Sequence, residues 1–266
     1  MRLRVDHETR YSYDAPVAYG LQQVRLRPKD TRGQKVLDWE IKIEGGESQL
    51  RYEDHNGNAV DLIGIEPGRT ETAIRCVGLI ENSESDGVLG AHRGFLPLWH
   101  FRRSSDLTEA GEGVRSIIDS LGEVDCSNVA TGHRLSEAIL KTVGYEGGNT
   151  HAGTTAEEAI AGGTGVCQDH AHIFCSAARA IGLPARYVSG YLMMNDRVEQ
   201  DASHAWAEAH FDGIGWVGFD ISNGYSPDER YIRIATGMDF REAAPVSGMR
   251  MGGSDEGVLV TLKVEQ

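Results

Sequence analysis

Hydrophobic and polar residues alternate with a period of two along the first 82 residues of the chain. Because successive side chains of a strand point to opposite faces of a sheet, this alternation is typical of strands that are buried on one face. Turn-forming residues separate the alternating segments, and Asn56-Gly57 favours a type I′ hairpin turn, in which both residues have positive φ. The pattern therefore predicts that residues 1–95 form an antiparallel β domain, with strands at 2–8, 24–27, 37–43, 49–53, 59–63 and 71–79.

After residue 83 the apolar residues take the spacing of three to four that marks amphipathic helices. Helices are predicted at 114–121, 135–143, 155–161 and 166–181, followed by strands at 185–193, 203–211 and 216–221. This pattern predicts that residues 96–266 form a second domain of helices and strands, and the expected fold class is α+β. A last strand, at about 257–265, could return to the first domain. The Gly-rich segment 243–256 is expected to be a loop or a mobile cover.

Composition and charge exclude several classes of protein. The 266 residues include 26 Lys and Arg against 40 Asp and Glu, a net charge of −14, which argues against nucleic acid as a partner. No run of about 18 apolar residues could span a membrane. The first residues alternate charged and apolar side chains and lack the apolar segment of a signal peptide, so we expect a cytoplasmic protein. Nothing in the pattern indicates an oligomeric state.

The four cysteines are few and irregularly spaced, which argues against a disulfide framework. Cys167 falls in the first turn of the helix predicted at 166–181, directly after a glycine-rich approach. The unpaired amide N–H groups and the positive dipole end at that position favour a thiolate. Cys167 is therefore a candidate nucleophile, although a cysteine at a helix start can also be a small core residue. We expect the other three to be core or loop residues: Cys76, Cys126 and Cys175.

A nucleophilic thiolate needs a base, and the base needs a group that orients it. His204 lies on the strand predicted at 203–211, and Asp220 lies on the next strand. If paired residue numbers in this hairpin sum to 424, His204 is directly opposite Asp220; if they sum to 426, the two are diagonal on one face. A sum of 425 puts them on opposite faces. The hypothesis therefore requires a hairpin loop with an odd number of residues, or a bulge.

These segments resemble the transglutaminase-like superfamily of papain-like thiol enzymes. The resemblance lies in residues 165–172, 179–191, 204–208 and 215–220. Residues 1–95 more loosely resemble the β domain that precedes the catalytic domain in bacterial members. The resemblance implies a papain/transglutaminase-like catalytic domain whose nucleophile helix packs on an antiparallel sheet. It also implies that Cys167 is the nucleophile, that His204 is the base and acid, and that Asp220 orients His204.

The implied chemistry is thiol-dependent acyl transfer at an amide carbonyl, through a thioester. We favour hydrolysis of peptide or isopeptide bonds, as in a cysteine protease or amidase, with protein-glutamine transamidation as the alternative. The expected partner is a peptide or protein amide substrate, and the mechanism needs no metal or cofactor. The backbone N–H of Cys167 is the expected oxyanion donor. Further candidates for binding the oxyanion or lining the site are Gln168, Trp206, Tyr191 and His151.

Two alternatives come from other classes of protein. The first is a zinc site built on the Cys167-x-x-His170 spacing. His172 would lie about 140° around the helix from His170, which disfavours joint coordination. The second is a catalytically silent binding module that keeps the fold. The presence of all three triad residue types favours an enzyme.

Overall fold

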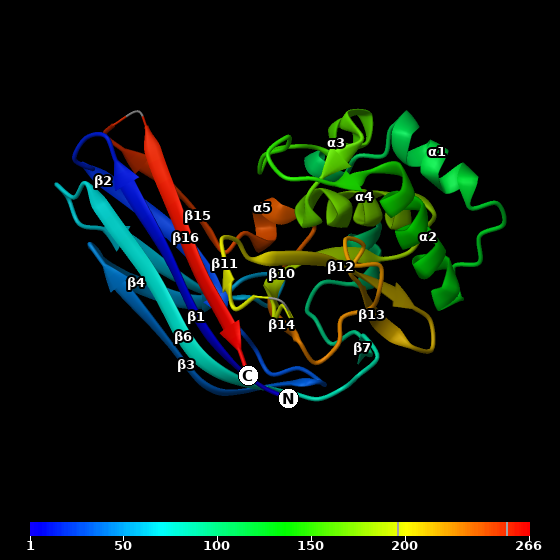
Figure 1. Ribbon diagram of the computed structural model, residues 1–266, viewed down its shortest axis with the longest axis horizontal. Helices are drawn as coiled ribbons and strands as arrows, with labels where there is room; N and C mark the ends of the chain where they lie inside the picture. Colours follow the sequence, from blue (N-terminus) through cyan, green and yellow to red (C-terminus); the bar gives the residue numbers. More distant parts are fainter. Residues whose placement is uncertain (196, 254) are drawn as a thin grey trace.

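Two facing antiparallel sheets form the N-terminal part of the computed structural model, which describes residues 1–195, 197–253 and 255–266 (Figure 1). Apolar side chains from both sheets, such as Tyr11, Val24 and Ile63, make one core between them. The first sheet has the order β11-β16-β1-β6-β3 and the second β15-β2-β5-β4. The first-half strands are β1 (Arg2–Tyr13), β2 (Tyr19–Arg27), β3 (Gln34–Glu44), β4 (Gly46–Glu53), β5 (Ala59–Ile65) and β6 (Glu71–Asn82).

These six strands confirm the interpretation of the period-two alternation, and all six are longer than the pattern indicated. The β4–β5 hairpin also exists, but its turn is not type I′. Among its residues only Gly57 has a positive φ, of 80°. The reason is the Asp54 side chain, which accepts the backbone N–H groups of Asn56 and Asn58 at 3.0 and 2.9 Å and so stabilises a wider loop.

The second half contains an antiparallel sheet of order β14-β10-β12-β13-β7 with helices on one face. Strand β12 turns Ala205, Ala207 and Ala209 toward the core, and these small side chains let helix α4 approach closely. The strands are β7 (Val88–Gly90), β10 (Ala185–Leu192), β12 (His204–Phe211), β13 (Gly215–Phe219) and β14 (Tyr231–Gly237), with a short parallel pair β8 (Gly144–Tyr145) and β9 (Thr164–Gly165).

The four helices predicted in this half are present, so the α+β class is confirmed. Helix α2 begins six residues before the predicted start, because Asn128 caps it by accepting the N–H of Ala130. The Thr155–Glu158 capping box at the start of α3 is present. The helices are α1 (Glu112–Ser120), α2 (Val129–Thr142), α3 (Ala156–Gly162), α4 (Cys167–Ala180) and α5 (Phe240–Ala243), with 3₁₀ turns at Leu98–Arg102 and Asp106–Thr108.

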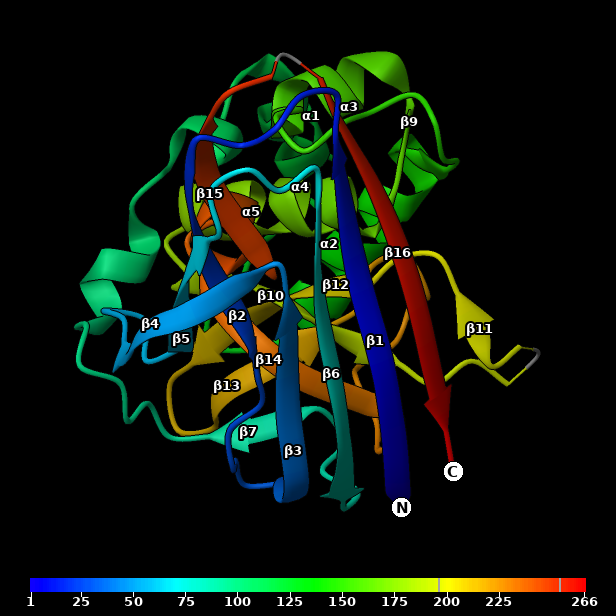
Figure 2. The ribbon, with the colours of Figure 1, turned by 90° about the vertical axis from the view of Figure 1, so that its left-hand side faces the viewer.

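The two parts exchange strands across the boundary expected near residue 95. Strand β7 pairs with β13 in the second-half sheet, whereas β11 (Glu199–Gln200), β15 (Val246–Met251) and β16 (Glu256–Glu265) join the first-half sheets (Figure 2). The expectation of a loop over 243–256 was therefore wrong for most of that segment, in which Ser254 lies outside the described residues. Strand β15 exposes Met249 and Met251, so its sequence lacks a clear alternation, and its partner β2 lies far away in the chain.

No helix among the described residues is long and apolar enough to cross a membrane.

A buried carboxylate stabilises the centre of the second-half sheet. Glu208 on β12 is fully buried, and its two oxygens accept hydrogen bonds from Arg186 on β10 at 2.6 Å and Arg233 on β14 at 2.8 Å. The Arg186 guanidinium also lies 3.9 Å from the ring centre of Trp216. The two guanidinium groups hold the pKa of Glu208 below its ordinary value, although burial opposes them.

We predict that Glu208→Ala lowers the free energy of unfolding by about 3–5 kcal/mol, because it leaves two mostly buried cations, 13% and 19% exposed, without their partner. The matched control is Glu81→Ala, which breaks an exposed ion pair with Arg2 and should cost at most about 1 kcal/mol. Urea denaturation of both variants measures the difference. Equal losses in the two variants would contradict a structural role for the Glu208 network.

Candidate active site

Cys167 is the first residue of α4, and the chain around it is fixed by the side chain of Asp169. Asp169 is 1% exposed and accepts the N–H of Val166 at 2.8 Å and the hydroxyl of Thr150 at 2.7 Å. A Cβ atom at Gly165 would lie 2.8 Å from the Cβ of Asp169, so glycine is required for this close packing. The result is a helix start at which the Cys167 side chain reaches a cavity.

His204 is the first residue of β12, and Asp220 directly follows β13, its neighbour in the sheet. The register pairs Ala207 with Phe219 and Phe211 with Gly215, which is the sum of 426. The three loop residues, 212–214, satisfy the requirement for an odd loop. His204 and Asp220 are consequently diagonal on one face, and His204 Nε2 lies 2.6 Å from Asp220 Oδ2.

Asp220 is fully buried, and three side chains donate to one of its oxygens. Besides His204, the Tyr231 hydroxyl and the Asn223 amide both donate to Oδ2 at 2.7 Å. Oδ1 accepts the backbone N–H of Asn223 at 3.2 Å. Burial raises the pKa of Asp220, but the hydrogen bonds from His204, Tyr231 and Asn223 lower it more, so it stays below its ordinary value. Asp220 is therefore an ionised carboxylate.

The protonation of His204 follows from its two neighbours. Burial lowers the pKa of His204, but hydrogen bonds to Asp220 and Cys167 and the charges of both groups outweigh burial and raise it to about 10. Because Nε2 faces Asp220, the other ring nitrogen, Nδ1, is the one available to the thiol. The geometry therefore supports an imidazolium beside Cys167 at neutral pH.

The cavity beside Cys167 has a volume of about 470 Å³. Aromatic and apolar residues form part of its wall, and the segment that leads from β11 to His204 forms a polar side. The lining residues besides Cys167 and His204 are Tyr145, Val166, Gln168, Tyr187, Met194, Arg197, Glu199, Gln200, Asp201, Ala202, Ser203, Ala205 and Phe240.

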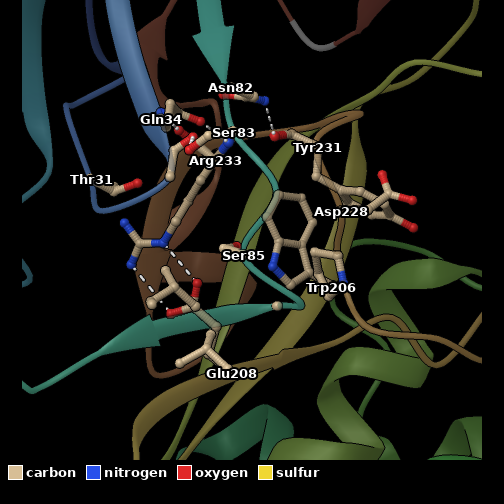
Figure 3. Close-up of a pocket in the computed structure, with 15 residues that line it drawn as sticks. Thr31, Gln34, Asn82, Ser83, Ser85, Trp206, Glu208, Asp228, Tyr231 and Arg233 are labelled. Atoms are coloured by element: carbon tan, nitrogen blue, oxygen red, sulfur yellow. Dashed lines mark hydrogen bonds and ion pairs between the residues drawn. The ribbon is translucent and has the colours of Figure 1, made fainter. Parts of the chain in front are cut away.

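Trp206 supports His204 from behind and does not line this cavity. Its ring stacks on that of His204, with centroids 6.2 Å apart, and meets the Tyr231 ring edge-on at 5.5 Å. A Cβ atom at Gly190 would lie 2.6 Å from the indole, so this packing also depends on a glycine. Trp206 and Tyr231 instead line a second cavity of about 60 Å³ between the two parts of the chain (Figure 3).

The expectation for Tyr191 was wrong, because the residue lies away from Cys167. Its side chain is 1% exposed and packs against the first-half sheet, where its hydroxyl lies 2.7 Å from Nδ1 of His7 and 3.6 Å from the sulfur of Cys76. Strand β10 has a register shift at Ser189–Gly190, between Tyr187 and Tyr191. Because of this shift, the position of Tyr191 along the strand does not by itself predict its surroundings.

Gln168 and His151 differ in their relation to the site. Gln168 lines the cavity, and its amide Nε2 lies 3.5 Å from the carbonyl oxygen of His151. The His151 ring is exposed, and its Nδ1 accepts the backbone N–H of Gly153. His151 thus contributes a carbonyl that contacts Gln168, and its imidazole bonds within its own loop.

His170 is committed to structural hydrogen bonds, which weakens the zinc alternative. Its Nδ1 lies 2.9 Å from the Ser222 hydroxyl and its Nε2 lies 3.0 Å from the Val143 carbonyl oxygen. The contact with Ser222 joins α4 to the turn that follows Asp220. Among the described residues no group of three or more His, Cys, Asp or Glu side chains is placed to hold a metal ion.

Sequence reasoning missed the residues that surround the triad. Asn223 stands three residues after Asp220, a spacing typical of Asp side chains that accept nearby backbone N–H groups. Tyr231 carries no comparable local signal, because its contact with Asp220 is made across the sheet.

Comparisons with known proteins agree with this geometry. The family model "Transglutaminase-like superfamily" matches residues 123–221, and "Bacterial transglutaminase-like N-terminal region" matches residues 3–81. An uncharacterized protein of Mycobacterium leprae is 25% identical and one of Mycobacterium bovis is 28% identical; the alignments cover 94% and 97% of this chain and 94% and 90% of the relatives.

A solved structure from Cytophaga hutchinsonii, of a protein proposed to be a cysteine protease, has the same fold. It superposes with a TM-score of 0.75 at 20% identity, over 100% of this chain and 98% of the other. The matches to both family models follow the order of the two parts seen here, and the core match includes Cys167, His204 and Asp220. Residues 123–221 therefore form a transglutaminase-like core, and residues 3–81 before it form a bacterial transglutaminase-like N-terminal region.

Proposed function

We propose that this protein is a cysteine hydrolase that cleaves peptide or isopeptide bonds through a thioester on Cys167. The observation that carries the proposal is that a helix-start cysteine and a histidine line one cavity, and that a buried aspartate holds the histidine ring at 2.6 Å. These are the parts that thiol-based acyl transfer requires: a nucleophile, a base and an orienting group.

In the first half of the reaction the Cys167 thiolate attacks the amide carbonyl carbon and a C–S bond forms. The oxyanion that develops accepts a hydrogen bond from the backbone N–H of Cys167 at the start of α4. The His204 imidazolium gives its proton to the amide nitrogen, the C–N bond breaks and the amine leaves. Asp220 keeps the ring of His204 in one orientation during this transfer.

In the second half, neutral His204 takes a proton from water, and the hydroxide formed attacks the thioester carbonyl. The C–S bond breaks, a carboxylic acid leaves, and the thiolate–imidazolium pair is restored. An amine in place of water would give transamidation. The polar side of the cavity, formed by Gln200, Asp201 and Ser203 among others, gives water access to the thioester and so supports hydrolysis.

We predict that iodoacetamide at neutral pH alkylates Cys167 before the other cysteines. Burial raises the pKa of Cys76 to about 12 and that of Cys175 to about 11, and it also raises the pKa of the Cys126 thiol, so thiolate is scarce at these positions. Mass spectrometry of the alkylated protein measures the four rates.

The His204→Ala variant should reduce the alkylation rate of Cys167 at least about tenfold, because it removes the cation paired with the thiolate. The matched control, His55→Ala, changes an exposed histidine in the turn between β4 and β5 and should leave the rate unchanged. Equal reactivity of all four cysteines in the unmodified protein would instead support a silent binding module.

We predict that the His204 ring titrates with a midpoint near pH 10, well above the ordinary value of about 6.5. The imidazolium then persists through neutral pH and is lost only as the pH rises through that midpoint. Asp220→Asn removes one of the groups that raise the pKa of His204, so the midpoint should fall. NMR of the ring signals against pH measures both, and an unchanged midpoint in the variant would contradict the assigned role of Asp220.

We predict that the protein cleaves β-casein, an unfolded test substrate, and that Cys167→Ala lowers the rate at least about a thousandfold. Cys126→Ala, the control at the other partly exposed cysteine, should retain activity. The assay includes dansylcadaverine as an amine. New peptide termini indicate hydrolysis, whereas dansyl incorporation without cleavage would overturn hydrolysis in favour of transamidation.

A further inference from the structure

The outer edge of β16 is largely unpaired and lies next to the candidate active site. On its inner side β16 pairs with β1 from Glu256 to Glu265, but on its outer side it pairs with β11 only at Leu262 and Lys263. Figure 2 shows the short β11 beside the lower part of β16. Among the described residues no strand pairs with the outer edge from Glu256 to Thr261.

The backbone of this edge is directed outward at alternate residues. Val264 donates its N–H outward to the carbonyl of Val198, at 3.3 Å. In an antiparallel strand the N–H and C=O of one residue point to the same side, and the side alternates along the strand. Leu262, Val260 and Val258 therefore direct their backbone groups to the outer edge, and the groups of Val260 and Val258 have no strand partner there among the described residues.

The edge strands β3 and β4 carry features that discourage pairing, and the β16 edge does not. Strand β3 has a register shift at Val36–Asp38 and several charged residues, and β4 has a shift at Ser48–Leu50 and charged residues as well. Charges and bulges of this kind prevent the addition of another strand. Residues 257–261 of β16 are uncharged and unbroken, and Val258 is 55% exposed and Leu259 64% exposed.

This open edge ends at the wall of the catalytic cavity. Glu199 and Gln200 of β11 both pair with β16 and line the cavity. Directly after Gln200 the chain leaves β16, and residues 201–203 line the cavity and lead into His204. A strand added to residues 257–261 would therefore lie on the same sheet edge as β11 and next to the point where the cavity wall departs from it.

We propose that the outer edge of β16, at residues 257–261, binds an extended segment of a polypeptide substrate as an added strand and delivers the adjoining amide to Cys167. Backbone hydrogen bonds to Val258 and Val260 supply the affinity, as in other cases of strand addition. β11 shows that this edge accepts a strand. The inference rests on the proposed function and specifies its substrate class: unfolded or extended chain segments, in preference to small amides.

The test compares iodoacetamide with two peptide agents that carry the same reactive group. Iodoacetamide is too small to reach β16 from Cys167. The other two agents are eight-residue peptides of alternating Thr and Val with flanking lysines. One carries an iodoacetyl group at its N-terminal end, and the other carries it at its C-terminal end. Mass spectrometry measures the rate of alkylation at Cys167 for each agent in the full-length protein.

The central variant is Val260→Pro, with Val258→Pro as a second form. Proline removes an N–H that faces the open edge, so the ladder between β16 and β1 is kept while strand addition is blocked. The matched control is Val260→Thr, which keeps the N–H and the β-branched shape. Circular dichroism selects the proline variant that retains the fold.

We expect at least one peptide agent to alkylate Cys167 of the unmodified protein about tenfold faster than iodoacetamide does, in line with two hydrogen bonds of ordinary net strength. The proline variant should lose this advantage and keep its iodoacetamide rate, and Val260→Thr should behave like the unmodified protein. A rate advantage that survives in both proline variants, or its absence in the unmodified protein, would overturn the proposal.

Two further outcomes are separated by the same design. If iodoacetamide itself shows no preference for Cys167, the proposed function fails, independently of β16. If the peptide gives no advantage and light scattering shows a dimer that Val260→Pro dissociates, the edge pairs with a second copy of this chain, and the substrate proposal is overturned.

Discussion

The buried carboxylate of Asp220 is the constraint on which the arrangement of the second half depends. A buried charge that lost its partners would cost several kcal/mol, so the structure must bring donors to it. They come from three places in the chain: His204 from β12, Asn223 from the turn after β13, and Tyr231 from β14. The positions of these strands are thus tied to the same atom that orients the histidine beside Cys167.

Strand β12 combines two kinds of surface. One face carries only small or aromatic apolar residues, such as Ala205 and Ala207, and packs against α4. The other carries His204, Trp206 and Glu208, which contact Asp220, Tyr231 and Arg186 respectively. Because both faces are buried, the register of β12 is fixed on both sides, and a shift by one residue would expose the alanines to the polar partners.

Sequence reasoning reached the centre of the site because its signals are local. The helix start at Cys167 and the alternation that includes His204 can both be found within a few residues, and the condition on the hairpin loop followed from counting. Long-range contacts were out of reach. Tyr231 meets Asp220 across the sheet, Tyr191 packs against a strand from the other half, and β15 pairs with β2 without a clear pattern of its own.

The position of β11 has a consequence for how the protein is made. Two residues of β11, Glu199 and Gln200, line the cavity beside Cys167. They pair with Lys263 and Leu262, which follow them by more than sixty positions in the chain. During synthesis Cys167, His204 and Asp220 leave the ribosome well before residues 262 and 263. The thiol of Cys167 can therefore approach His204 in a partly made chain, but the wall of the cavity is completed only when β16 has been synthesised and added to β1. A nascent chain whose β16 has not yet left the ribosome would have an incomplete cavity, so full assembly of the site waits for this strand.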